Sequence, residues 1–400
     1  MQHNQSIERV QRYQPCLAGI RGYGFLLVFC GHYFIARQLG HPDTIRLKAL
    51  TALSSIALFA VPSFFVLSGY LIGGILYHTR HREGYFKIFY TRRILRVFPV
   101  FYITLLTIGC FALYRGIHLN SRIYLLNFLY VQNLVPDFAH HRMGGSIGTI
   151  HFWSLAVEEQ FYLLWPLVVW LFPERRKLIA IASGLIAASC ALRLAAPLFS
   201  MTPSDIRVFT PTQVDAILAG VLLGLLHEGP VYNRIKPFAK WVVASGCATV
   251  ILLAVWKGEL WAWTYWGDEI LIPISHLTAV GIVMMVMDEG SFVNRLCSQR
   301  WVCGLGGLSY SMYVFHLTFA AYFMGTVMPE LARHMRLSFA ILLSGGLAFA
   351  TTLALGLLSY LLIERPVMRM KHHLRYGSVI RTDLKLRVGE PVLSETSASV

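Results

Sequence analysis

Charged side chains are scarce in this chain of 400 residues, and their scarcity excludes an ordinary soluble protein. Asp, Glu, Lys and Arg make up 14% of the residues, whereas soluble domains average about 25%. The apolar residues are gathered into runs of about 20, the length that a helix needs to cross a bilayer, and they do not alternate as in an outer-membrane barrel. We therefore expect an all-α, polytopic bundle of transmembrane helices.

Closely spaced cysteine pairs are also missing. None of the seven cysteines belongs to a Cys-x-x-Cys motif, and most lie within or beside apolar runs, where a thiol behaves as a small hydrophobic group. The pattern predicts neither a disulfide framework nor a metal site. The first apolar run begins near Leu17 and has no small-residue cleavage pattern after it, so we expect a permanent span and no removable signal peptide.

Acidic residues are few compared with basic ones. The sequence has 20 Asp and Glu against 35 Lys and Arg, which gives a formal net charge of +15. A basic chain can bind nucleic acid, but here the basic residues form short clusters beside the apolar runs, as the positive-inside rule predicts for cytoplasmic loops. We therefore expect the basic clusters to orient the chain in the membrane, and we expect no nucleic-acid partner.

Hydropathy and turn residues divide the apolar runs into about ten predicted spans. The predicted spans are 17–36, 51–77, 97–114, 153–171, 178–198, 211–227, 241–256, 270–287, 305–326 and 338–363. An even number places both termini on one side, and the basic clusters at 80–96 and 175–177 assign that side to the cytoplasm. The apolar stretch 123–135 is short for a span, and we expect it to be interfacial or re-entrant.

The spans predict one transmembrane domain, residues 1–370, followed by a polar cytoplasmic tail, residues 371–400. The tail is too short and too poor in apolar residues to fold alone, so we expect it to be disordered. No repeat of fixed period and no likeness between the two halves is visible in the sequence.

Arg21 and His32 stand in the first predicted span, where an arginine costs on the order of 2.5 to 3.5 kcal/mol to insert. Eleven α-helical residues return to within roughly 20° of the starting direction, about 16 Å further along the axis. The two side chains are therefore predicted to line one stripe that faces a cavity or a partner. The alternatives are that Arg21 reaches the cytoplasmic headgroups and that His32 is a hydrogen-bonded core histidine.

Arg93 and Arg96 stand one helical turn apart where the chain enters the third predicted span, and so on one helical face. Two forked guanidiniums on one face can grip phosphate groups bidentately. The simpler interpretation is topological, since arginines are expected at the cytoplasmic end of a span.

Two carboxylates, Glu158 and Glu159, stand one to two turns inside the fourth predicted span. Glu158 shares a helical face with Tyr162 while Glu159 points about 100° away, so we expect at most one of the two to face a given cavity. Glu158 and His32 lie at similar depth below the outer surface, so they can touch. A carboxylate that orients an imidazole makes a general base for a hydroxyl group. The alternative for Glu158 is a structural ion pair with a buried arginine.

Further candidates follow on the acceptor side, and Tyr162, on the same helical face as Glu158, is one of them. Asp215 is an acid near the outer end of the sixth predicted span, or else a carboxylate that the helix dipole favours at an N-terminus. His316 in the ninth span is a site residue or a core histidine. Trp261 and Trp263 belong to a tryptophan-rich stretch, which indicates an interfacial aromatic belt or a stacking platform for a sugar-like acceptor.

Taken together, these motifs resemble the bacterial acyltransferase-3 family of integral membrane O-acyltransferases, from about Tyr13 to Arg369. The segments that carry the resemblance are Leu17–Gly22 with His32, Phe64–Leu71, Arg93–Pro99, Phe152–Tyr162, Asp215–Gly220, Leu308–His316 and Ile363–Pro366. The chain departs from the family pattern at Ala18, where many members have Asp, and at Gln213, where many have Arg. Any role of those two family residues is absent here.

The resemblance implies an acyl-CoA donor on the cytoplasmic side and a carbohydrate-type or lipid-linked acceptor on the outer side of a bacterial inner membrane. Acyl-CoA is then a substrate, and no bound cofactor is expected. Arg93 and Arg96 would hold the CoA phosphates, and the pantetheine arm would pass Arg21, Ser68 and Gly69.

The thioester would then reach His32. The resemblance implies essential roles for His32 and Arg21, which we take as catalytic residues with Glu158, and for the pair Arg93 and Arg96. Oriented by Glu158, His32 would act as general base on the acceptor hydroxyl or carry the acyl group briefly. A transporter or flippase of a small anionic or sugar-like substrate is the alternative, because buried charges can also line a substrate path.

Overall fold

The computed structural model of the chain describes residues 14–35, 55–136, 143, 148–227, 229–257, 265–370, 374 and 376–377. These residues are largely helical and contain no β-strand. The longer helices are α2 (Pro15–Cys30), α4 (Ala60–Thr79), α5 (Tyr85–Arg115), α7 (Phe152–Leu171), α8 (Arg175–Ala195), α10 (Thr210–Leu226), α12 (Ala239–Lys257), α13 (Tyr265–Met287), α15 (Arg300–His316) and α18 (Leu337–Ser359). The prediction of an all-α fold is confirmed.

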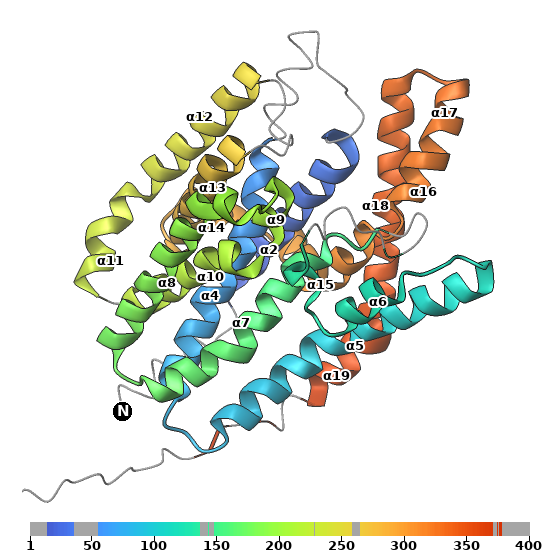
Figure 1. The fold of residues 1–400 in the computed structure, drawn as a ribbon. Helices are drawn as coiled ribbons and strands as arrows, with labels where there is room; N and C mark the ends of the chain where they lie inside the picture. Colours follow the sequence, from blue (N-terminus) through green and yellow to red (C-terminus); the bar gives the residue numbers. More distant parts are fainter. Residues whose placement is uncertain are drawn as a thin grey trace, which may run out of the picture.

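Shorter pieces connect or extend these helices. They are α6 (Ser121–Phe128), α9 (Pro203–Val208), α11 (Pro230–Ile235), α14 (Phe292–Cys297), α16 (Ala320–Tyr322), α17 (Met328–His334), α19 (Arg365–Met370) and the π or 3-10 turns η1 (Gly31–Ile35), η2 (Ser55–Phe59), η3 (Gln132–Leu134), η5 (Ala196–Phe199), η6 (Lys236–Phe238), η7 (Phe323–Val327) and η8 (Tyr360–Glu364). In Figure 1, α12 and α18 lie at opposite edges of the bundle, with α2 and α4 between them.

Seven segments of the described structure are long and apolar enough to cross a membrane. They are Ser55–Thr79, Tyr85–Arg115, Arg175–Phe199, Pro203–Leu226, Pro230–Trp256, Ile270–Met287 and Leu337–Met370. Each overlaps one predicted span. The other three predicted spans overlap α2, α7 and α15, which are not among the seven. The total of ten and the cytoplasmic placement of both termini therefore stay predictions.

Two apolar stretches depart from simple spans. The range 305–326 is not one helix, because α15 ends at His316 and the chain continues through α16 and η7. The stretch 123–135 forms α6 and then η3, and a helix of eight residues extends only about 12 Å. That is too short to cross a bilayer.

Only three residues of the predicted tail belong to the described structure, and they contact the start of α5 and the turn before it. The Arg92 guanidinium donates to the Leu374 carbonyl, and the Gly377 N–H donates to the Glu83 carbonyl at 3.3 Å. The prediction of disorder falls on residues outside the described part of the chain.

Glycines bring α4 and α10 into close contact. A Cβ added to Gly69 of α4 would collide with the carbonyl oxygen of Ile217, and one added to Gly220 of α10 would collide with that of Val66. Small residues at such points let two helix backbones approach within a membrane. Gly69, predicted to lie beside the donor, therefore contacts the backbone of α10.

The apolar core has two main parts, and five helices meet where they adjoin. One part joins buried residues of α2, α4, α7, α10 and α13. The other joins the end of α2 with α5, the start of α7 and α15. Polar residues of α2, α4, α5, α7 and α15 line one cavity among these helices.

Candidate active site

A cavity of about 110 Å³ lies inside the bundle, where α2, α4, α5, α7 and α15 meet. Its polar lining residues are Arg21, Ser68, Arg93, Arg96, Ser154, Glu158, Glu159, Tyr162, Ser309, Tyr310 and Tyr313. We call it the arginine cavity. At about 10 to 15 Å³ for each water-sized sphere it holds on the order of ten such spheres, which suits a small acyl group better than a long acyl chain.

Three arginines from two helices line this cavity. Arg93 and Arg96 come from α5, one turn apart as the sequence predicts, and Arg21 comes from α2. The Arg93 guanidinium lies over the ring of Tyr162 on α7, 4.6 Å from the ring centroid, which is within the range of a cation–π contact. The three side chains line one cavity, an arrangement that the positive-inside rule does not require.

Glu158 and Glu159 of α7 bring negative charge to the same cavity. Glu158 hydrogen-bonds the Ser68 hydroxyl and is attracted by all three arginines, and Ser68 also hydrogen-bonds the Tyr162 hydroxyl. Among the cavity-lining residues, three guanidiniums against two carboxylates leave a formal excess of one positive charge. That sign suits a phosphate or a developing thiolate.

The prediction that at most one of the two glutamates faces a given cavity is wrong, since both line the arginine cavity. The cavity extends around α7 rather than along one face of it. Glu158 meets Ser68 of α4, whereas Glu159 is attracted by Arg93 on α5 and acts electrostatically on Tyr310 of α15.

Three histidines from distant parts of the sequence gather beside this cavity, and we call them the histidine cluster. His32 lies in η1, His151 directly precedes α7, and His316 ends α15. The ring centroids of His32 and His316 are 5.2 Å apart, and those of His151 and His316 are 4.8 Å apart. Among the described residues, no three His, Cys, Asp or Glu side chains are arranged to hold a metal ion.

A π turn changes the predicted relation between Arg21 and His32. The predicted stripe assumes an α-helix as far as residue 32, but α2 ends at Cys30 and η1 is π-helical, with i to i+5 hydrogen bonds. The estimate of 100° per residue therefore does not hold at His32. Arg21 lines the arginine cavity, whereas His32 lies beside His316.

The predicted dyad of Glu158 and His32 stays a prediction. The principal polar neighbours of Glu158 are the three arginines and Ser68. The Nδ1 atom of His32 lies 2.9 Å from the carbonyl oxygen of Val28, which belongs to α2 directly before η1.

Tyr313 of α15 and Ser154 of α7 connect the arginine cavity with the histidine cluster. Both line the cavity, and their hydroxyl oxygens are 2.6 Å apart. The Tyr313 ring centroid is 5.5 Å from that of His151 and 5.2 Å from that of His316. The Tyr313 side chain therefore lines the arginine cavity and also contacts the histidine cluster.

Sequence reasoning did not single out three of these residues. His151 precedes the fourth predicted span, and the depth argument applied to His32 and Glu158 also brings it to the outer side. Tyr313 lies within the motif that ends at His316. Glu364 of η8 accepts a hydrogen bond from Ser311 and attracts Arg96. It lies within the Ile363–Pro366 motif, but the motif alone assigned it no role.

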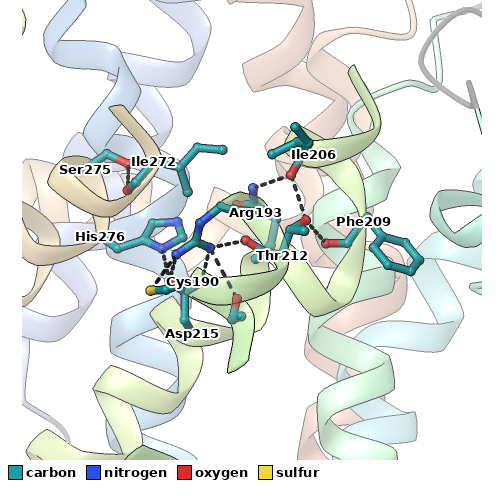
Figure 2. A network of polar contacts seen from close by, with 11 residues as sticks. Cys190, Arg193, Ile206, Phe209, Thr212, Asp215, Ile272, Ser275 and His276 are labelled. Atoms are coloured by element: carbon teal, nitrogen blue, oxygen red, sulfur yellow. Dashed lines mark hydrogen bonds and ion pairs between the residues drawn. The ribbon is translucent and has the colours of Figure 1, made fainter. Parts of the chain in front are cut away.

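A second polar network, away from the residues that line the arginine cavity, ties α8, α10 and α13 together (Figure 2). Arg193 of α8 donates from Nη1 to Oδ1 of Asp215 at 3.1 Å and from Nη2 to Oδ2 at 2.7 Å. His276 Nδ1 of α13 lies 3.1 Å from the same Oδ2, and Arg193 also donates to the Thr212 carbonyl. Asp215, predicted on the acceptor side, is thus the partner of a buried arginine.

The remaining acceptor-side candidates separate into two groups. Tyr162 lines the arginine cavity, among the residues assigned to the donor, and His316 belongs to the histidine cluster. Trp261 and Trp263 lie outside the described residues, so the stacking platform stays a prediction.

Known proteins provide a comparison for this arrangement. Residues 15–360 match the model of a family described as an acyltransferase domain. The chain is 24% identical over 389 residues to the peptidoglycan O-acetyltransferase OatA of Listeria monocytogenes, which covers 90% of this chain and 56% of that protein. It is 26% identical over 377 residues to the putative peptidoglycan O-acetyltransferase YrhL of Bacillus subtilis, covering 89% and 55% of the two chains.

The O-acetyltransferase OatA of Staphylococcus aureus is 26% identical over 326 residues, covering 76% of this chain and 50% of that protein. The chain thus spans about half the length of these relatives. No solved structure matches it.

Proposed function

The chain belongs to the acyltransferase family whose domain matches residues 15–360, and from this we propose that it is a membrane-embedded O-acyltransferase. It moves an acyl group from cytoplasmic acyl-CoA to a hydroxyl of a carbohydrate-type or lipid-linked acceptor on the outer side of the membrane. The observation that carries the proposal is a small, arginine-rich cavity inside an apolar bundle, with a cluster of histidines beside it.

We assign the donor to the arginine cavity. Arg93 and Arg96 bind the phosphates of acyl-CoA, because forked guanidiniums grip phosphate oxygens in pairs. Arg21 and Ser68 line the same cavity and lie along the path of the thioester end. The excess of positive charge also stabilises the thiolate that forms when the acyl group leaves. The volume of the cavity favours an acetyl group.

We assign the proton transfer to His32. The oxygen of the acceptor hydroxyl attacks the carbonyl carbon of the thioester, a C–O bond forms, and the C–S bond breaks. His32 takes the hydroxyl proton and returns it to the leaving thiolate, so the products are the ester and free CoA thiol. In the second route a nitrogen of His32 carries the acyl group between two successive transfers, with the same products.

We propose a peptidoglycan-type polysaccharide as the acceptor and the bacterial inner membrane as the location. Two similar proteins are named as peptidoglycan O-acetyltransferases, one of them putatively. Such an acceptor lies outside the cytoplasm while the donor is made within it, so an enzyme embedded in the membrane between them suits the reaction.

The test uses the purified chain in proteoliposomes with radiolabelled acetyl-CoA and soluble peptidoglycan fragments. The proposal predicts that label enters the fragments as an ester, which mild base releases as acetate. A transporter or flippase would move solute across the vesicle membrane and leave all label on CoA. Failure to label the fragments, together with movement of label across the membrane, would favour that alternative.

A further inference from the structure

Each ring of the histidine cluster has one nitrogen next to a backbone carbonyl. The three contacts are His32 Nδ1 to Val28 O at 2.9 Å, His316 Nδ1 to Tyr313 O at 2.6 Å and His151 Nε2 to Val314 O at 3.2 Å. A carbonyl oxygen can only accept, so the nitrogen that faces it carries the hydrogen. In a neutral ring the other nitrogen presents a lone pair, which is Nε2 in His32 and His316 and Nδ1 in His151.

Two of these lone pairs are deeply buried. His316 is 0% exposed and His151 is 3% exposed, and neither His316 Nε2 nor His151 Nδ1 has a hydrogen-bond partner among the described residues. A buried acceptor without a donor lowers stability and calls for an explanation. A hydrogen-bond donor that forms only during the reaction would explain why these acceptors are kept.

Protonated His32 is such a donor. Its ring centroid lies 5.2 Å from that of His316, with the two planes tilted by 55°, a separation at which one nitrogen of each ring can reach hydrogen-bond distance. When Nε2 of His32 takes a proton, it changes from acceptor to donor. His316 can receive this new N–H without adding a second charge to the site.

We propose that His316 is a positioning residue whose Nε2 accepts a hydrogen bond from protonated His32, with the Nδ1 lone pair of His151 as an alternative acceptor for the same N–H. The inference rests on the proposed role of His32 as the base. The proton leaves the acceptor hydroxyl for Nε2 of His32, is held there by His316, and then passes to the CoA thiolate. His316 itself is unchanged at the end of the reaction.

The other groups around His316 are aromatic or hydroxylic. Tyr33 of η1 donates its hydroxyl to the His316 carbonyl at 2.6 Å, Tyr313 lies beside the ring, and Phe25 of α2 meets it edge-on. The charged residues of the arginine cavity share its lining with Tyr313 and Ser154, and none of the three histidines lines that cavity. In these surroundings, the lone pair on Nε2 of neutral His316 is the hydrogen-bond partner that His32 gains when it is protonated.

Three amide substitutions separate the free nitrogen from the backbone contact. His316→Asn keeps an N–H at the position of Nδ1, which can still donate to the Tyr313 carbonyl, and removes the acceptor at Nε2. His316→Gln places an amide oxygen near Nε2 and so keeps an acceptor. His151→Gln keeps the donor toward Val314 and removes the lone pair at Nδ1.

All variants are assayed as the full chain in proteoliposomes, with acetyl-CoA and soluble peptidoglycan fragments, and their thermal unfolding is recorded. We expect His316→Asn to lower kcat at least tenfold with the KM for acetyl-CoA within about twofold. His316→Gln should retain most of the activity, and His151→Gln should fall between the two. Because His316 stabilises protonated His32, the acid limb of the kcat–pH profile should move to lower pH in His316→Asn.

Two results would overturn the inference while the wild-type chain transfers acetyl groups normally. One is a kcat for His316→Asn within about threefold of wild type. The other is an equal loss in His316→Asn and His316→Gln, which would mean that the ring is needed for packing. Absence of transfer by the wild-type chain is a different result, and it would count against the proposed function itself.

Discussion

Arg193 of α8 and Asp215 of α10 form a bidentate ion pair in which the two side chains are 1% and 5% exposed. A charged pair buried to this degree is costly to desolvate, and breaking it by removing one partner leaves the other charge uncompensated. The pair accounts for an arginine within an apolar span and gives Asp215 a role in holding helices together.

We therefore expect Arg193→Met to destabilise the protein by about 3 to 5 kcal/mol, and thermal unfolding in detergent measures this loss. The double variant Arg193→Met with Asp215→Leu removes both charges and should recover much of the stability. Activity per folded molecule should change little in the double variant. Unfolding of Arg193→Met at the wild-type temperature would contradict a structural role.

His32→Ala should remove the base and lower acetyl transfer by about 10²- to 10⁴-fold. The chain should remain inserted and folded. A monodisperse elution profile in detergent and an unchanged thermal unfolding temperature would show this. His334→Ala is a suitable control, because that side chain is 72% exposed on α17. Near-normal turnover by His32→Ala would remove His32 from the mechanism.

Arg93→Ala should raise the KM for acetyl-CoA by about 10- to 100-fold, as expected for losing hydrogen bonds to a charged phosphate, and change the KM for the acceptor much less. Arg92→Ala is the matched control, because Arg92 is adjacent on α5 but contacts Leu374 and does not line the cavity. Initial rates with varied donor and acceptor measure both constants. An unchanged KM for acetyl-CoA in Arg93→Ala would mean that Arg93 only orients its span in the membrane.

Glu158→Gln should reduce kcat more than Glu159→Gln. Glu158 is attracted by all three arginines of the cavity and hydrogen-bonds Ser68, whereas Glu159 is attracted by Arg93 alone among them. Losing the charge at Glu158 therefore disturbs the donor site more widely. If Glu159→Gln proves the more damaging change, the assignment of Glu158 to the catalytic machinery must be abandoned.

The sequence predicts the helical segments well because apolar runs near 20 residues have few other structures open to them. It does not predict where helices break within such runs. The π turn that holds His32 and the end of α15 at His316 both occur in apolar sequence without proline. These breaks depend on neighbouring helices, and they decide where the two histidines lie.

In the candidate site, too, the sequence predicts features that depend on spacing within one helix, but not contacts between different helices. The spacing of Arg93 and Arg96 placed them on one helical face, and both line the cavity. The partner of Asp215 could not be found in this way, since Arg193 lies 22 residues earlier on another helix. The joint exposure of Glu158 and Glu159 likewise depends on how the cavity extends around α7.

The most direct measurement places donor and acceptor on opposite sides of a sealed membrane. Proteoliposomes carry the purified chain, soluble peptidoglycan fragments are trapped inside, and radiolabelled acetyl-CoA is added only outside. We predict that base-labile acetyl label appears on the trapped fragments with the wild-type chain and not with His32→Ala. Label that stays on CoA or is released as free acetate, while the wild-type chain is folded and the vesicles are sealed, would contradict transfer across the membrane by this protein.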